Sequence, residues 1–92
     1  MITEVHDTRY VVRTVAGKPL FIVAEQKAIN GAGGTISHYR LSDDLLEAAK
    51  CINLTTAKTL IKDFTSAKES TKTFEPVKIR VTYTLEEDDA RR

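Results

Sequence analysis

Apolar and polar residues alternate without a break over residues 77–85, near the end of the chain. A period of two residues is typical of a strand with one face on a hydrophobic core and the other toward water or a partner. Residues 35–41 alternate less regularly, and residues 9–15 are rich in valine and tyrosine. All three stretches are therefore predicted to be strands.

Residues 20–24 are apolar at every position, which favours a central strand covered on both faces. Before this run, Gly17 and Pro19 supply the residues that a tight turn needs. After it, residues 30–34 are nearly all glycine and alanine, so we expect a flexible hairpin tip there.

The period changes to that of a helix in the middle of the chain. Leu45, Ala48, Ala49 and Ile52 share one helical face, and Asp44 stands at the position of an N-terminal cap. Asn53 is a good cap for a second segment. The apolar residues of that segment are Ala57, Leu60, Ile61 and Phe64. The pattern leaves open one bent helix or two helices, followed by a polar connection over residues 65–73.

The predicted order is β-β-β-α(α)-β, which indicates an α+β fold with one or two helices packed on one face of a small, mostly antiparallel sheet. Residues 1–85 are expected to form a single domain, and residues 86–92 a charged, flexible tail. The helices are expected to cover the face that carries Val77, Ile79, Val81, Tyr83 and Leu85. The opposite face, with Lys78, Arg80, Thr82 and Thr84, is then bare and is the expected interaction or dimer surface.

Composition narrows the class of protein. The 92 residues are 41% hydrophobic and 29% charged, with a formal net charge of +1, as in ordinary globular domains without bulk attraction to nucleic acid or membrane. Cys51 is the single cysteine, so no intramolecular disulfide can form. No secretory signal or apolar run of membrane-spanning length is visible. A cytoplasmic protein is expected.

Candidate catalytic groups are sparse. The loop over residues 30–35 lacks the Gly-Lys-Ser/Thr end of a phosphate-binding loop and does not lead into a helix. His6, His38 and Cys51 lack the spacing of a metal site, and Cys51 is expected to be a buried, inert thiol. The acidic residues Asp43, Asp44 and Glu47 suit a helix N-terminus without catalysis. We therefore expect a non-enzymatic protein with no cofactor and no metal.

A basic surface is the main alternative. Arg13, Lys78 and Arg80 are expected on the open sheet face, and Lys58, Lys62 and Lys68 on the outer side of the second helix. Such a surface suits single-stranded nucleic acid when an exposed aromatic ring accompanies it. Tyr83 is assigned to the buried face, however, so solvated lysines are the favoured interpretation.

The second half of the chain carries a resemblance. Residues 44–53 (DLLEAAKCIN), the helix predicted at residues 57–64 and residues 75–85 together resemble small phage and prophage proteins of Gram-positive bacteria. Those proteins show an aspartate-leucine segment, an alanine-lysine pair, an amphipathic helix and a closing strand of alternating Val, Thr and Tyr. The chain departs from them in its glycine-rich loop and in its early strands, which lack aromatic residues that are often found there. The resemblance implies a phage accessory protein and carries over no functional residue.

The function predicted from these patterns is binding of a host or phage protein. Its most specific form is inhibition of a bacterial defence nuclease, as anti-CRISPR proteins do; a small nucleic-acid-binding module is the alternative. A second copy of the chain is a further candidate partner, and no membrane partner is expected. The predicted partner-binding residues are Arg13, Asn30, Gly31, Gly33, Gly34, Lys78, Arg80, Thr82 and Thr84.

Overall fold

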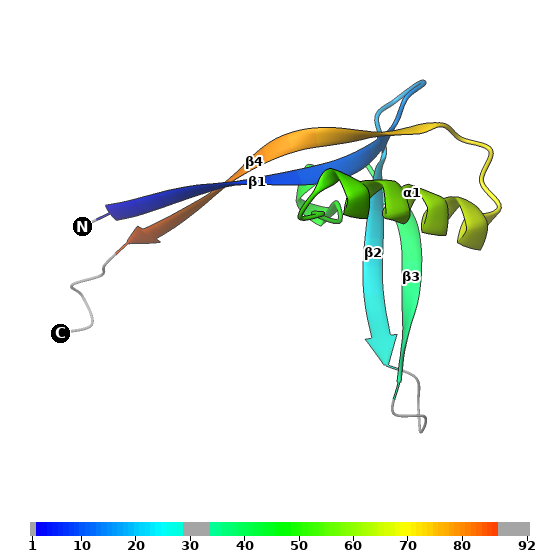
Figure 1. Cartoon of the computed structure of the whole chain (residues 1–92), viewed down its shortest axis with the longest axis horizontal. Helices are drawn as coiled ribbons and strands as arrows, with labels where there is room; N and C mark the ends of the chain where they lie inside the picture. Colours follow the sequence, from blue (N-terminus) through cyan, green and yellow to red (C-terminus); the bar gives the residue numbers. More distant parts are fainter. Residues whose placement is uncertain (1, 29–33, 87–92) are drawn as a thin grey trace.

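The computed structural model describes residues 2–28 and 34–86 (Figure 1). It contains strands β1 (Ile2–Thr14), β2 (Phe21–Ala28), β3 (Thr35–Ser42) and β4 (Phe74–Glu86), the 3-10 turn η1 (Leu45–Glu47) and helix α1 (Leu54–Lys68). The four strands form one antiparallel sheet in the order β3-β2-β1-β4. The predicted α+β fold is confirmed, with a single α-helix packed against the sheet.

The sheet consists of two long ribbons that meet at one corner. Strands β1 and β4 pair over their whole length, from Ile2↔Glu86 to Thr14↔Phe74. Strands β2 and β3 also pair throughout, whereas β1 and β2 share only the register pair Arg13↔Phe21. Figure 1 shows the two ribbons leaving this corner in different directions, with α1 beside it. We use the name body for this corner, where β1 meets β2 at Arg13 and Phe21, together with α1 and η1.

Residues 49–51 form an extended segment between β1 and β2, where these two strands diverge. The amide of Ala49 donates to the carbonyl of Ile22 at 3.0 Å. Cys51 exchanges two backbone hydrogen bonds with Tyr10, at 2.7 and 2.8 Å. These bonds need extended backbone, so the prediction that the stripe from Leu45 to Ile52 is helical is wrong beyond its first turn. That turn is η1, and Asp44 caps it by accepting from the amide of Leu46.

Helix α1 begins and ends with distinct caps. Asn53 is the predicted N-cap, and its side chain accepts from the amide of Thr56 at 2.8 Å. The helix continues to Lys68, into the stretch predicted as a connection, and stops at Glu69 in the left-handed conformation (φ 49°, ψ 43°). A left-handed residue ends a helix because its carbonyl and amide no longer follow the helical path.

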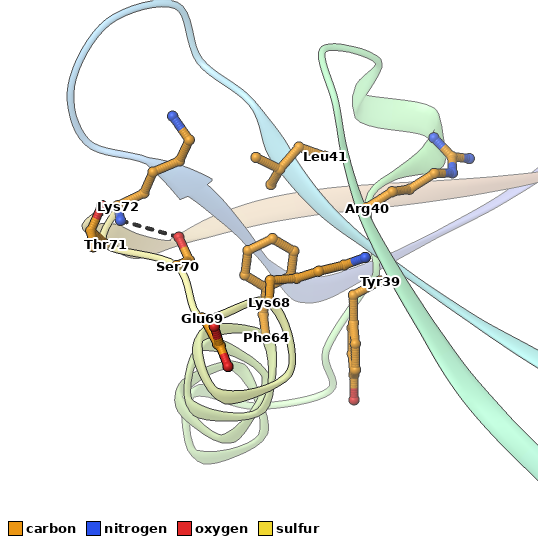
Figure 2. Close-up of a pocket in the computed structure, with 9 residues that line it drawn as sticks. All are labelled: Tyr39, Arg40, Leu41, Phe64, Lys68, Glu69, Ser70, Thr71 and Lys72. Carbon is orange, nitrogen blue, oxygen red and sulfur yellow. Dashed lines mark hydrogen bonds between the residues drawn. The ribbon is translucent and has the colours of Figure 1, made fainter.

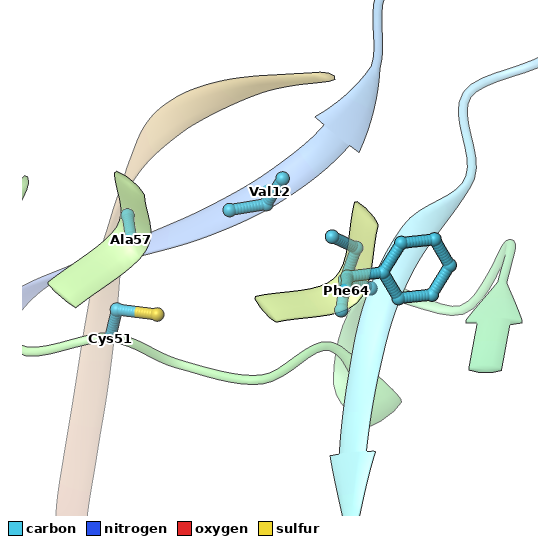
Figure 3. Packing of buried hydrophobic residues seen from close by; sticks show 5 residues of the cluster. Val12, Cys51, Ala57 and Phe64 are labelled. Atoms are coloured by element: carbon cyan, nitrogen blue, oxygen red, sulfur yellow. The ribbon is translucent and has the colours of Figure 1, made fainter. Parts of the chain in front are cut away.

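The hydrophobic core lies where α1 crosses the corner (Figure 3). Its buried members are Val12, Ile22, Cys51, Ala57 and Phe64. Phe64 is 3% exposed and meets the rings of Tyr39 and Phe74 edge to face. Val11 and Val23 are also buried, on the opposite face of their strands from Val12 and Ile22. The prediction of a strand covered on both faces is therefore confirmed at Ile22 and Val23.

Helix α1 lies on the face of β4 opposite to the predicted one. Tyr10 and Val12 belong to the core around α1, and the register sets Lys78 opposite Tyr10 and Pro76 opposite Val12. Opposed residues of antiparallel strands share a face, so α1 lies on the side of Lys78 rather than of Val77. The predicted burial of the Val77–Leu85 row under helices is thus wrong. Alternation defines two faces, but the face that the helix covers is set by its packing against Tyr10, Val12 and Ile22.

The molecule is far from spherical. Its radius of gyration is 16.7 Å, and its extents are 54 × 40 × 23 Å. A compact domain of this length has a radius of gyration of about 12 Å. The accessible surface is 6842 Å², against about 5,400 Å² for a typical monomer of this mass. The ribbons that extend away from the core contribute to this elongated shape.

Candidate functional site

A long exposed part of the fold is the outer half of the β1–β4 ribbon. We call residues 2–9 and 79–86 the arm. In Figure 1 the arm extends away from α1 and from the β2–β3 ribbon. On the edge of β1 that faces away from β4, the outermost pairing within the described residues is that of Tyr10 with Cys51. From Arg9 outward, β1 and β4 pair only with each other among the described residues, and a lone two-stranded ribbon is marginally stable in water.

One face of the arm carries a row of apolar side chains on β4, formed by Ile79, Val81, Tyr83 and Leu85, with Val5 opposite Tyr83 on β1. Tyr83 is 56% exposed, Leu85 63% and Val5 57%. The expectation that Tyr83 is buried is therefore wrong. Ile79 and Val81, nearer the body, are half-buried. Large exposed apolar patches on soluble proteins are common at sites of interaction. We call these five residues the apolar row.

The β1 side of this face is charged. Asp7 and Arg9 form an ion pair at 2.6 Å, and they stand opposite Val81 and Ile79. The two charges balance locally, so the face has no net charge from them. The apolar surface is consequently concentrated on β4, the strand at the edge of the sheet.

Four of the predicted partner-binding residues share the opposite face of the same ribbon. Lys78, Arg80, Thr82 and Thr84 are all exposed, as expected. His6 stands opposite Thr82, and its Nδ1 atom lies 2.9 Å from the Thr82 hydroxyl. This face is polar and basic near the body. The two faces of the arm therefore differ in chemistry as sharply as the alternation predicted.

The structure does not bring the remaining predicted residues to this face. Arg13 stands opposite Glu75, to which its Nε atom donates at 2.9 Å, and it lies on the other face of β1 from Tyr10. Gly34 precedes β3 at the far end of the second ribbon. Asn30, Gly31 and Gly33 lie outside the described residues. Gly34 therefore lies on a different ribbon from Lys78, Arg80, Thr82 and Thr84.

A surface hollow of about 520 Å³ lies beside the end of α1 (Figure 2). It is lined by Tyr39, Arg40, Leu41, Phe64, Lys68, Glu69, Ser70, Thr71 and Lys72. Aromatic and aliphatic groups meet lysines here, an arrangement that suits a small group with an apolar body and a negative charge. Sequence reasoning missed the hollow because it treated residues 65–73 as a plain connection. The paired lysines at positions 68 and 72 were its only signal.

The titratable groups of the body serve the fold. Burial raises the pKa of the Cys51 thiol, which disfavours the reactive thiolate. Hydrogen bonds from Arg40 and Ser42 lower the pKa of Glu47 and tie η1 to β3. A hydrogen bond from Lys18 lowers the pKa of Asp43. Each of these groups has a structural partner or a buried position that accounts for its pKa.

Within residues 2–28 and 34–86, no group of three or more His, Cys, Asp or Glu side chains is placed to hold a metal ion. In the same part of the chain, no helix is both long and apolar enough to cross a membrane.

Known proteins offer no guide to this surface. Comparison with protein-family models, with curated proteins and with solved structures finds no match. The geometry of the arm is therefore the basis for a proposed function.

Proposed function

We propose that this chain is a non-enzymatic binding protein that docks on another protein through the apolar row of its arm. The observation that carries the proposal is the exposure of Val5, Tyr83 and Leu85 on a ribbon that extends beyond the core. These side chains do nothing for the packing of the body. Covering them with a partner removes apolar area from water, at about 25 cal/mol for each Å².

The resemblance to phage and prophage proteins favours a host or phage protein as the partner. The most specific form of the proposal is an inhibitor that occupies a surface of a bacterial defence nuclease. An extended ribbon is suited to this role because it reaches into a cleft while the body stays outside. Aromatic and large aliphatic residues such as Tyr83 are the usual anchors of protein–protein interfaces.

The test compares two variants of the same ribbon. The double variant Tyr83→Ser, Leu85→Ser removes the apolar row, whereas Thr82→Ser, Thr84→Ser changes the other face by one methyl group at each position. Tagged proteins are used to capture partners from nuclease-treated lysate of a phage host, and the captured proteins are identified. A protein retained by the wild type and by the threonine variant, but lost with the first variant, supports the proposal. Equal capture by all three would refute it.

A nucleic-acid-binding module is the second candidate. Lys78 and Arg80 lie on the same side of the sheet as α1, whose Lys58, Lys62 and Lys68 are exposed. A common basic side is what binding to phosphates requires. Binding of single-stranded DNA or RNA that weakens steeply with salt, and disappears in Lys78→Glu, Arg80→Glu, would establish this function instead. Unchanged binding after this reversal removes it.

A further inference from the structure

The open edge of β4 has a defined pattern of free backbone groups. Tyr10 directs both its amide and its carbonyl to Cys51, away from β4. Its opposite residue Lys78 therefore belongs to a pair without hydrogen bonds between the strands, and the backbone groups of Lys78 point to the open edge. The same holds at every second residue: Arg80, Thr82 and Thr84. Pro76 also has this parity, so its missing N–H removes no bond to β1.

We propose that this edge pairs antiparallel with β4 of a second copy of the chain, about a two-fold axis at Val81. In this register Lys78 stands opposite Thr84 of the second copy, and Arg80 opposite Thr82. All of these residues direct their amides and carbonyls outward, so the new pairs are the hydrogen-bonded ones. Pro76 falls opposite Glu86 and ends the ladder there.

The side chains are self-complementary in the same register. On the apolar face, Val81 meets Val81, Ile79 meets Tyr83 and Val77 meets Leu85. Each β4 side chain of the row thus gains an apolar neighbour, the kind of cross-strand pair that stabilises sheets. On the other face, each cation meets a threonine.

Repulsion between like charges disfavours the registers with the two-fold axis at Arg80 or at Ile79. An axis at Arg80 sets this residue against itself, and an axis at Ile79 sets Lys78 against Arg80. Like charges directly opposite destabilise a pair of strands. An axis at Thr82 avoids this clash but leaves Val77 without an opposite residue in β4 of the second copy, which ends at Glu86. The axis at Val81 alone among these four pairs the whole run from Val77 to Leu85 with itself.

This dimer extends the proposed function without depending on it. Joining the two edges unites two apolar rows into one continuous apolar face, while the face itself stays open to a partner. The second copy covers the exposed edge of β4, which is otherwise a site for uncontrolled pairing. The arm therefore uses its edge for a second copy and its face for another protein.

Disulfide trapping tests the register. In a Cys51→Ala background, Val81→Cys places two thiols across a pair whose Cα atoms are about 4.5 Å apart, within the disulfide range. Ile79→Cys is the matched control, since its two copies are separated by about 13 Å along the strands. We expect a covalent dimer from Val81→Cys, none from Ile79→Cys, and a mixed dimer when Ile79→Cys and Tyr83→Cys chains are combined. Trapping by Thr82→Cys instead of Val81→Cys, or equal trapping by Val81→Cys and Ile79→Cys, would overturn the proposed axis.

Proline substitution tests the edge itself. Thr82→Pro removes an outward amide and leaves the bonds to β1 in place, whereas Thr82→Val keeps the amide and removes only the hydroxyl. Sedimentation at rising concentration is expected to show twice the 10.3 kDa chain mass for wild type and Thr82→Val, and a monomer for Thr82→Pro. A wild-type monomer at every concentration refutes the dimer. Because Thr82→Pro keeps Tyr83 and Leu85, its capture of a partner protein tests the proposed function separately.

Discussion

The body and the arm are parts of the same two strands, yet they differ in what covers them. Val11 and Val12 of β1 are fully buried, whereas Val5, six residues before Val11, is 57% exposed. On β4, Val77 is half-buried, and Leu85 is 63% exposed. On β4 the alternation of apolar and polar residues is the same at both ends. Burial is thus decided by neighbouring elements and not by the strand's own pattern.

The body gains its neighbours from segments distant in sequence. Helix α1, strand β2 and the segment at residues 49–51 all converge on β1 between Tyr10 and Thr14. The arm has the pairing of β1 with β4 alone among the described strands. One ribbon therefore combines a region that contacts distant segments with a region that, among the described strands, has only its own pairing. Substitutions in the two regions are expected to separate stability from binding.

The largest expected effect is the loss of the central ring of the body. Phe64→Ala removes a side chain that is 3% exposed and contacts the rings of Tyr39 and Phe74. Such truncations lower the free energy of unfolding by about 3–5 kcal/mol, which is comparable with the whole stability of a small domain. Urea unfolding followed by circular dichroism is expected to show a strongly lowered midpoint or an unfolded chain.

Leu85→Ala is the matched truncation in the arm. Because Leu85 is exposed, the free energy of unfolding is expected to change by less than about 0.5 kcal/mol. A loss from Leu85→Ala as large as that from Phe64→Ala would contradict the division into body and arm. It would show that the apolar row is buried in the protein in solution.

Much of this architecture could be read from the sequence because the signals are local. The cap at Asn53, the stripe from Ala57 to Phe64 and the alternation after Pro76 all depend on residues close together in the chain. They predicted α1, β4 and the α+β fold correctly. Lys78, Arg80, Thr82 and Thr84 are likewise exposed on one face of β4, as predicted.

The errors arose where distant segments decide the structure. Residues 2–8 were not predicted as a strand, because their polar residues pair only through β4. Residues 49–51 have a helical pattern but form the extended segment between β1 and β2. The open face was inverted because alternation cannot say which side a helix will cover. The apolar row was recognised as a pattern, and its exposure followed only from the tertiary arrangement.

A smaller effect is expected from the cap of α1. Asn53→Ala removes the acceptor of the Thr56 amide and is expected to lower the free energy of unfolding by about 1 kcal/mol. Asn53→Asp keeps an acceptor and is the control. Amide hydrogen exchange then sharpens the comparison, since exchange should accelerate in α1 while the outer arm residues keep their rates. Acceleration confined to the arm would contradict this assignment.

A stabilising change is expected at the other end of α1. Glu69 has φ 49°, a conformation that glycine adopts without strain. Glu69→Gly is therefore expected to raise the free energy of unfolding by up to about 1 kcal/mol. The gain is reduced by the greater conformational entropy that glycine has in the unfolded chain. Ala67→Gly, inside the helix, should lower it by about as much. Thermal unfolding of both variants should show shifts of opposite sign, and shifts of the same sign would refute the strain at Glu69.

The smallest effect concerns the ion pairs that Glu47 and Asp43 form with Arg40 and Lys18. The pKa values of Glu47 and Asp43 are lowered, mainly by hydrogen bonds from Arg40 and Lys18. A carboxyl whose pKa is lower in the folded state stabilises the fold above its unfolded pKa, and this contribution is lost as the pH falls through the folded value. Stability should thus decline as the pH drops below about 4, and less steeply in Arg40→Gln. Because these carboxylates are exposed, the difference will be small. Parallel pH profiles for the wild type and Arg40→Gln would show that the ion pair does not stabilise the body.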